Sequence, residues 1–185
     1  MSARLNARIR QNKLTVWNQY IELANSAYES GQFSIGNKML RAASGECACD
    51  AEMCLVLAET YERFAQIRVE IGELAQAEQL LKRAISMHER IGREESLESI
   101  NRLLMCLAVY MAKGNKHEVA LRYLGKAMIV SRRLKTISSA GAADQARRLC
   151  QIWTEKGRHN EANLVFGYLS RITVAAEQHL EAGKT

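Results

Sequence analysis

Proline is absent from this chain of 185 residues. Because proline is the residue that interrupts a helix most strongly, nothing in the sequence forces a helix to break, and Gly, Asn and Ser must form the turns. Alternating runs of β-branched residues are also missing, whereas Ala, Leu, Glu, Arg, Gln and Met are frequent. These frequent residues lose little side-chain freedom in a helix. The sequence therefore predicts an all-α protein.

Long apolar runs are missing as well. No run approaches the ~18 residues that a membrane-spanning helix requires, so we expect no membrane span. Acidic residues are absent before Glu22, while Arg4, Arg8, Arg10 and Lys13 make the start of the chain basic. An Arg-rich, acid-poor start can be an organelle transit peptide. The alternative, which we favour, is a first helix with a solvated outer face.

The cysteines do not form an obvious disulfide or metal framework. Their number is five, and most stand where small apolar residues are expected, which favours a reducing, cytoplasmic location. Cys47, Cys49 and Cys54 are close in sequence, but paired zinc ligands are usually about two to four residues apart, and the first gap here is one residue. We therefore expect packing at a helix start, with a metal site or a reactive thiol as the alternatives.

No set of catalytic residues can be recognised. The sequence has no nucleophile–base pair, no Gly-rich phosphate loop and no carboxylate pair at a characteristic spacing. His117 and His159 stand at equivalent turn positions where a ring can plug a helical hairpin, and Trp17 and Trp153 are expected in the core or in a groove wall. We predict that the protein is not an enzyme and binds no cofactor or metal.

Four copies of one pattern recur along the chain. Each has a large apolar residue before a small one, then a Gly-type turn, then small, large and small or apolar residues on the next helix. The leading pairs are Leu23-Ala24, Phe64-Ala65, Leu107-Ala108 and Leu149-Cys150. The turn residues are Gly31, Gly72, Asn115 and Gly157. The last three positions are Gly36, Leu40 and Ala43; Ala77, Leu81 and Ala84; Ala120, Leu124 and Ala127; and Ala162, Phe166 and Leu169.

The leading residues are 41, 43 and 42 residues apart. A fixed period of this size is typical of stacked repeats, because a single helical hairpin cannot bury both of its faces. We expect one domain over 1–185, with repeats near 14–44, 50–92, 94–135 and 140–181. We also expect Asp50 to cap a helix, Gly92 to end one, and Ser44-Gly45 to break the chain. The expected helices span about 13–30, 33–44, 51–71, 73–91, 94–113, 116–135, 142–156 and 159–181.

This pattern resembles the tetratricopeptide repeat family over residues 17–176. The period is longer than the family's ~34 residues, and the family's proline between repeats is missing. The resemblance implies an α-solenoid of four stacked antiparallel hairpins in a right-handed superhelix. It also implies that the first helices line a concave groove that holds a peptide or a helix of a partner protein.

The resemblance also assigns residues to that groove. Asn25, Gln66 and Gln151 occupy equivalent positions, where amides could hold the backbone of a ligand. The implied groove residues are Asn18, Ile21, Asn25, Tyr28, Glu62, Gln66, Arg102, Met105, Val109, Arg147 and Gln151.

Charge is unevenly distributed. Residues 46–98 hold twelve acidic and six basic residues, whereas residues 99–185 hold fourteen basic and six acidic ones. The densest basic cluster, 122–148, could bind an acidic partner or phosphates, or could be a solvated face. Its members are Arg122, Lys126, Arg132, Arg133, Lys135, Arg147 and Arg148.

The predicted function is that of a non-catalytic adaptor or scaffold that binds a peptide or helix of another protein in the groove. One alternative is a scaffold that assembles with itself through repeats of opposite charge. Another is a nucleic-acid-associated regulator that uses the 122–148 cluster. Nucleic acid is the less favoured partner, because no aromatic residues interleave with the basic ones and an acidic block occupies the middle of the chain.

Overall fold

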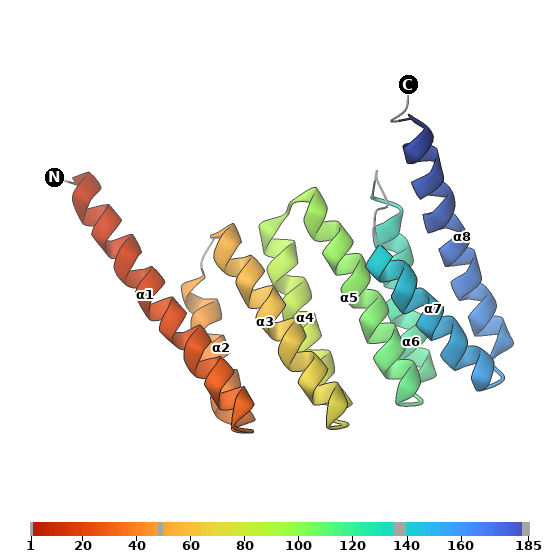
Figure 1. The fold of residues 1–185 in the computed structure, drawn as a ribbon, viewed down its shortest axis with the longest axis horizontal. Coiled ribbons are helices and arrows are strands. Elements are labelled where there is room, and N and C mark those ends of the chain that lie inside the picture. Colours follow the sequence, from red (N-terminus) through yellow and green to blue (C-terminus); the bar gives the residue numbers. More distant parts are fainter. Residues whose placement is uncertain (1, 48–49, 135–139, 183–185) are drawn as a thin grey trace.

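The computed structural model describes residues 2–47, 50–134 and 140–182, with side chains for 11–47, 50–134 and 141–172 (Figure 1). Regular structure in these ranges is helical throughout, without a strand, so the prediction of an all-α protein is confirmed. None of the helices described is both long and apolar enough to cross a membrane. The helices are α1 Ser2–Glu29, α2 Phe33–Glu46, α3 Ala51–Glu70, α4 Leu74–Ile91, α5 Glu94–Lys113, α6 His117–Ser131, α7 Ala140–Glu155 and α8 His159–Ala182.

Helix boundaries follow the local signals with three exceptions, of which the last is the end of α6, at Ser131 instead of near residue 135. Asp50 caps α3 by accepting hydrogen bonds from two backbone N–H groups, and Gly92 ends α4 in the left-handed conformation, both as expected. The first exception is α1, which begins at Ser2 instead of near residue 13. The second is Ser44-Gly45, which does not break α2, since the N–H of Cys47 still bonds to the carbonyl of Ala43.

Four equivalent turns join the helices in pairs. Each turn residue adopts a left-handed φ: +73° at Gly31, +81° at Gly72, +59° at Asn115 and +69° at Gly157. In each case the N–H of the next residue donates to a carbonyl five residues earlier, at 2.7–2.8 Å. These bonds satisfy the last carbonyls of the first helix in every pair, which explains why Gly or Asn recurs at this position.

The two helices of each pair approach closely because small residues face one another. Ala24, Ala65 and Ala108 on the first helices are fully buried, and Gly36 on α2 tolerates no larger residue. A Cβ atom added to Gly36 would lie 2.4 Å from Cδ2 of Tyr28. Pairs then lie side by side in chain order, and α5 packs against α4, α6 and α7, which makes it the most buried helix (Figure 1).

The first and last copies of the pattern depart from the middle two. Leu23 on α1 and Phe166 on α8 are each 55% exposed, whereas the equivalent large residues of the middle copies are buried. On α8, Val165 and Tyr168 face the core in place of Phe166. Among the described helices α1 and α8 are the outermost, so in each of them one large residue of the pattern has no described helix pair to pack against.

Candidate functional site

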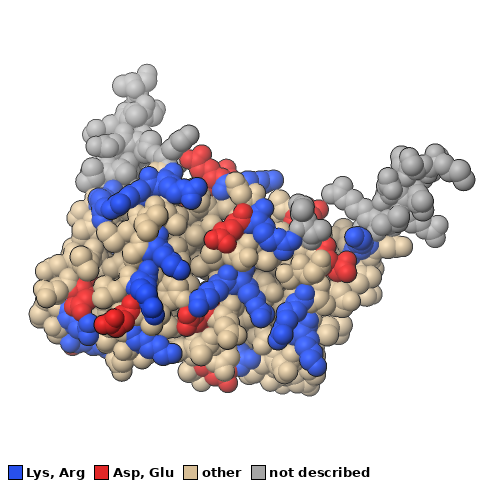
Figure 2. All heavy atoms as spheres, turned by 180° about the vertical axis from the view of Figure 1, so that it is seen from behind, with Lys and Arg blue, Asp and Glu red and all other residues tan. Residues whose placement is uncertain are grey.

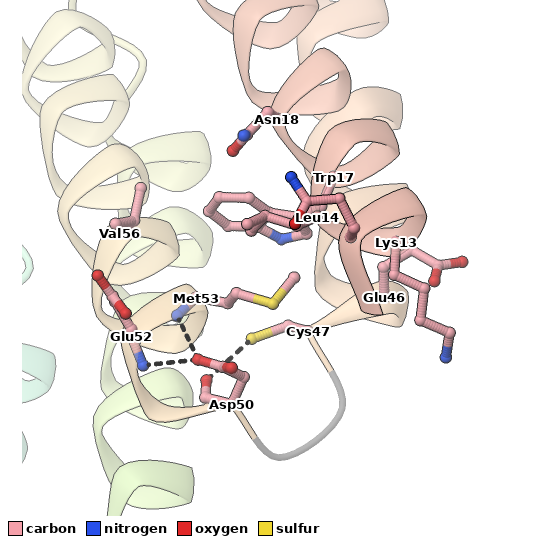
Figure 3. Close-up of a pocket in the computed structure, with 11 residues that line it drawn as sticks. Lys13, Leu14, Trp17, Asn18, Glu46, Cys47, Asp50, Glu52, Met53 and Val56 are labelled. Carbon is pink, nitrogen blue, oxygen red and sulfur yellow. Dashed lines mark hydrogen bonds between the residues drawn. The ribbon is translucent and has the colours of Figure 1, made fainter. Parts of the chain in front are cut away.

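A hollow of about 700 Å³ lies between α1 and α3 (Figure 3). Leu14, Trp17 and Met53 point into this gap, whereas Lys13 and Glu46 point away from it. The hollow is lined by Gln11, Lys13, Leu14, Trp17, Asn18, Glu46, Cys47, Asp50, Glu52, Met53 and Val56. Its floor is therefore apolar, and its polar groups lie at the edges.

The hollow exists because α1 and α3 meet closely only near one end. Near that end the rings of Tyr28 and Phe64 stack with their centroids 3.5 Å apart, and Arg63 donates to the side chain of Asn25. Toward the other end α1 continues past its partner, since α1 has 28 residues and α2 has 14. The first half of α1 is thus left without a helix of its own pair beside it.

Apolar side chains at this site are unusually accessible. Leu14 is 43% exposed and Val56 is 36% exposed, and both line the hollow together with the buried indole of Trp17. The indole N–H of Trp17 is buried, and within the described ranges no acceptor lies within hydrogen-bonding distance of it. An exposed apolar floor beside an unsatisfied donor is typical of a surface that receives another group.

The structure places the predicted groove residues in different environments. Asn18 lines the hollow, Ile21 is half-buried, and Gln66, Arg147 and Gln151 are exposed. The assignment of Tyr28, Met105 and Val109 to an open groove is wrong, because all three side chains are at most 3% exposed.

Packing explains these three errors. Tyr28 is covered by Phe64 and donates a hydrogen bond to Asn37 Oδ1 at 2.8 Å. Met105 and Val109 are on α5, against which α7 packs directly. The contact is so close that a Cβ atom on Gly141 of α7 would lie 2.7 Å from Cδ of Arg102. The groove expected over α5 is filled by α7.

The three equivalent amides already have partners within the chain. Gln66 Nε2 donates to Glu70 at 3.4 Å, and Gln151 Nε2 donates to Glu155 at 2.8 Å. Asn25 accepts from Arg63, as described above. Since Gln66 and Gln151 are exposed, these bonds are weak and could be exchanged for bonds to a ligand.

Glu62 joins three helices through charge. Its Oε2 accepts from Arg102 of α5 at 2.7 Å, and its Oε1 lies 3.8 Å from Nε2 of the buried His88 of α4. Burial disfavours the charged carboxylate, but the neighbouring His88 and the charge of Arg102 outweigh it and hold the pKa of Glu62 below 4.5. Glu62 is therefore committed to holding the fold together, although the sequence placed it in the groove.

Low pH should reduce the folding stability of the protein, partly through protonation of Glu62. A carboxyl whose pKa is lowered on folding contributes stability above its unfolded pKa of about 4.5 and loses it as the pH falls through the folded pKa. Glu62→Gln should lower the free energy of unfolding by about 1 kcal/mol at pH 7, because hydrogen bonds to a charged group are the stronger ones. The deficit should shrink below pH 4.5 in urea titrations followed by circular dichroism, whereas the exposed control Glu59→Gln should track wild type throughout. A deficit that does not change with pH would contradict the assignment.

The predicted basic cluster is divided between two helices. Arg122, Lys126, Arg132 and Arg133 are exposed on α6 and at its end, whereas Arg147 and Arg148 are exposed on α7, and α6 lies behind α7 (Figure 1). Lys135 lies outside the described residues. Seen from behind, Lys and Arg side chains are spread over the whole face of the molecule (Figure 2). The sequence cluster thus does not fold into one compact patch.

Among the described residues, no group of three or more His, Cys, Asp or Glu side chains is arranged to hold a metal ion. Cys49, one of the three clustered cysteines, lies outside the described residues. Comparison with models of protein families gives no match, and no curated protein matches the sequence. The function proposed next therefore depends on the geometry of this chain alone.

Proposed function

We propose that this chain is a non-catalytic adaptor built as a long-period tetratricopeptide-like solenoid of four stacked hairpins in a right-handed superhelix. Its ligand is a segment of another protein, either an extended peptide or a helix. The hollow between α1 and α3, with its apolar floor, is the observation that carries this proposal. The binding surface is therefore placed at the first two repeats, instead of along the whole row of first helices.

The chemistry of the hollow favours a segment with one or two apolar anchors. Leu14, Val56 and Met53 would be removed from water when such an anchor enters, which is the main source of affinity at small interfaces. A carbonyl oxygen brought to the indole N–H of Trp17 would satisfy a donor that has no acceptor among the described residues. Asn18, at the edge of the hollow, can bond the backbone of the segment.

Leu14→Glu should weaken partner capture at least tenfold, because a carboxylate in an apolar pocket must lose its hydration when the anchor binds. The measurement is quantitative pull-down from the native cell, followed by calorimetry with the captured partner's purified binding segment. The matched control is Ile129→Glu, which changes an apolar residue that is 61% exposed on α6, away from the hollow. Circular dichroism verifies that both variants are folded.

Partners that bind Leu14→Glu and wild type equally would rule out the hollow as the binding surface. Partners lost with Ile129→Glu and retained with Leu14→Glu would place the surface on α6 instead.

A second copy of the chain is the alternative occupant. The start of α1 exposes Leu14 and Val16 and is basic in sequence, so it could pack against the acidic second repeat of another copy. Sedimentation of the protein alone, run at low and high salt before the pull-down, separates a homo-oligomer from an adaptor. Nucleic-acid binding through the 122–148 cluster has less support, because α6 and α7 divide the cluster.

A further inference from the structure

Two cysteines meet where the first helix pair joins the second. Cys47 follows the last residue of α2, and Cys54 lies in the first turn of α3. Both are buried, with 0% and 1% of their surface exposed, and their Sγ atoms are 2.9 Å apart. One thiol donates a hydrogen bond to the other, and Cys47 Sγ also lies 3.7 Å from the carbonyl oxygen of Asp50 (Figure 3).

We infer that Cys47 and Cys54 are an oxidation site, at which an intramolecular disulfide ties the end of α2 to the start of α3. The two sulfur atoms are less than about 1 Å farther apart than in a disulfide bond of ~2.04 Å. Closing this gap requires the two sulfur atoms to approach by less than about 1 Å. The oxidation of this pair does not depend on the function proposed above, although Cys47 lines the same hollow.

The bond would act at the weakest junction of the fold. Helices α2 and α3 share few contacts, whereas α4 and α5, at the next junction, pack extensively. Cys47 also belongs to the floor of the hollow between α1 and α3, although it has no exposed surface of its own. A covalent bond here would hold the first pair against the second and fix one side of the hollow.

The oxidant we assign is a small hydroperoxide, such as hydrogen peroxide, which can enter the hollow next to Cys47. The Cys47 thiolate attacks the O–O bond and becomes a sulfenic acid, and the peroxide leaves as hydroxide. The Cys54 sulfur then attacks the Cys47 sulfur, expels its hydroxyl group as water and forms the S–S bond. In total, two thiols and one hydrogen peroxide give one disulfide and two waters.

Burial explains why this site should react slowly near neutral pH. Loss of hydration, the hydrogen bond with Cys54 and the proximity of the second thiol raise the pKa of Cys47 to about 12. Because the thiolate is the attacking form, its fraction rises about tenfold for each pH unit below that pKa. The oxidation rate should therefore rise about tenfold per pH unit, which is about a hundredfold between pH 7 and pH 9.

The experiment uses the full chain with Cys49→Ser, so that only one pairing remains between Arg41 and Arg63, a stretch without other Lys or Arg. The folded, reduced protein is treated with hydrogen peroxide, unfolded, alkylated, cut with trypsin and weighed by mass spectrometry. We expect the peptide 42–63 to lose two hydrogen atoms and to take up no alkyl group. The melting temperature should rise by roughly 5 °C, because the bond restricts the unfolded chain.

Two controls make the result decisive. In wild type, Cys49 can also pair with Cys47 or Cys54. If the bond between Cys47 and Cys54 dominates in the folded protein but not in urea, the native geometry is the cause. The double variant Cys49→Ser and Cys54→Ser, which lacks both neighbouring thiols, should instead stop at the sulfenic acid of Cys47. Two alkylated cysteines after oxidation of the Cys49→Ser protein, or a bond through Cys49 in folded wild type, would overturn the proposal.

Discussion

Met105→Lys should abolish cooperative folding. Met105 is 0% exposed at the centre of α5, a helix that packs against α4, α6 and α7. Taking a charge out of water, together with the lost packing, should cost at least about 4 kcal/mol, which is a large part of the stability of a domain this size. Urea unfolding followed by circular dichroism measures the loss directly.

The chain supplies a matched control for this change. In the fourth copy of the pattern the equivalent position is occupied by Arg147, which is exposed and pairs with Asp144 at 2.5 Å. Arg147→Met should therefore alter the free energy of unfolding by no more than about 0.5 kcal/mol. If Met105→Lys unfolded at the urea concentration of wild type, the face of α5 would be open after all, as the groove expected from sequence requires.

Trp153→Ala should lower the free energy of unfolding by about 3–5 kcal/mol, because it removes the largest fully buried side chain in the described ranges and leaves a cavity. Trp153 holds α7 against the turn before α6, where its indole N–H donates to Nδ1 of His117 at 3.2 Å. Burial and the charge of Arg158 lower the pKa of His117, which keeps that nitrogen unprotonated and able to accept. The loss is read from thermal and urea unfolding.

Trp153→Phe separates the ring from its hydrogen bond. It retains most of the buried area and removes the donor to His117, so it should cost about 1–2 kcal/mol. A loss as large as that of Trp153→Ala would mean that the hydrogen bond, and not the packing, dominates. Equal stability of Trp153→Ala and wild type would contradict the packing of α7 described above.

The sequence was sufficient for the helical class, the pairing of helices and most of their ends. Left-handed turns at Gly31, Gly72, Asn115 and Gly157 and the cap at Asp50 depend on a few neighbouring residues, so local chemistry predicts them. The alternation of small and large residues likewise predicts which faces of a pair touch. The sequence could not predict that α1 starts at Ser2, because residues 2–12 lack a capping signal that would separate them from the helix that follows.

The site itself depended on long-range packing. Four copies with one period suggest four equivalent surfaces, yet α5 packs extensively against α7, whereas α1 and α3 touch only near one end. Met105 on α5 is therefore buried, whereas Leu14 on α1 is exposed. Spacing along the chain specifies which face of its own helix a residue occupies. Whether the next pair covers that face depends on the angle at which pairs stack, which large side chains such as Tyr28, Phe64 and Trp153 set together across the interface.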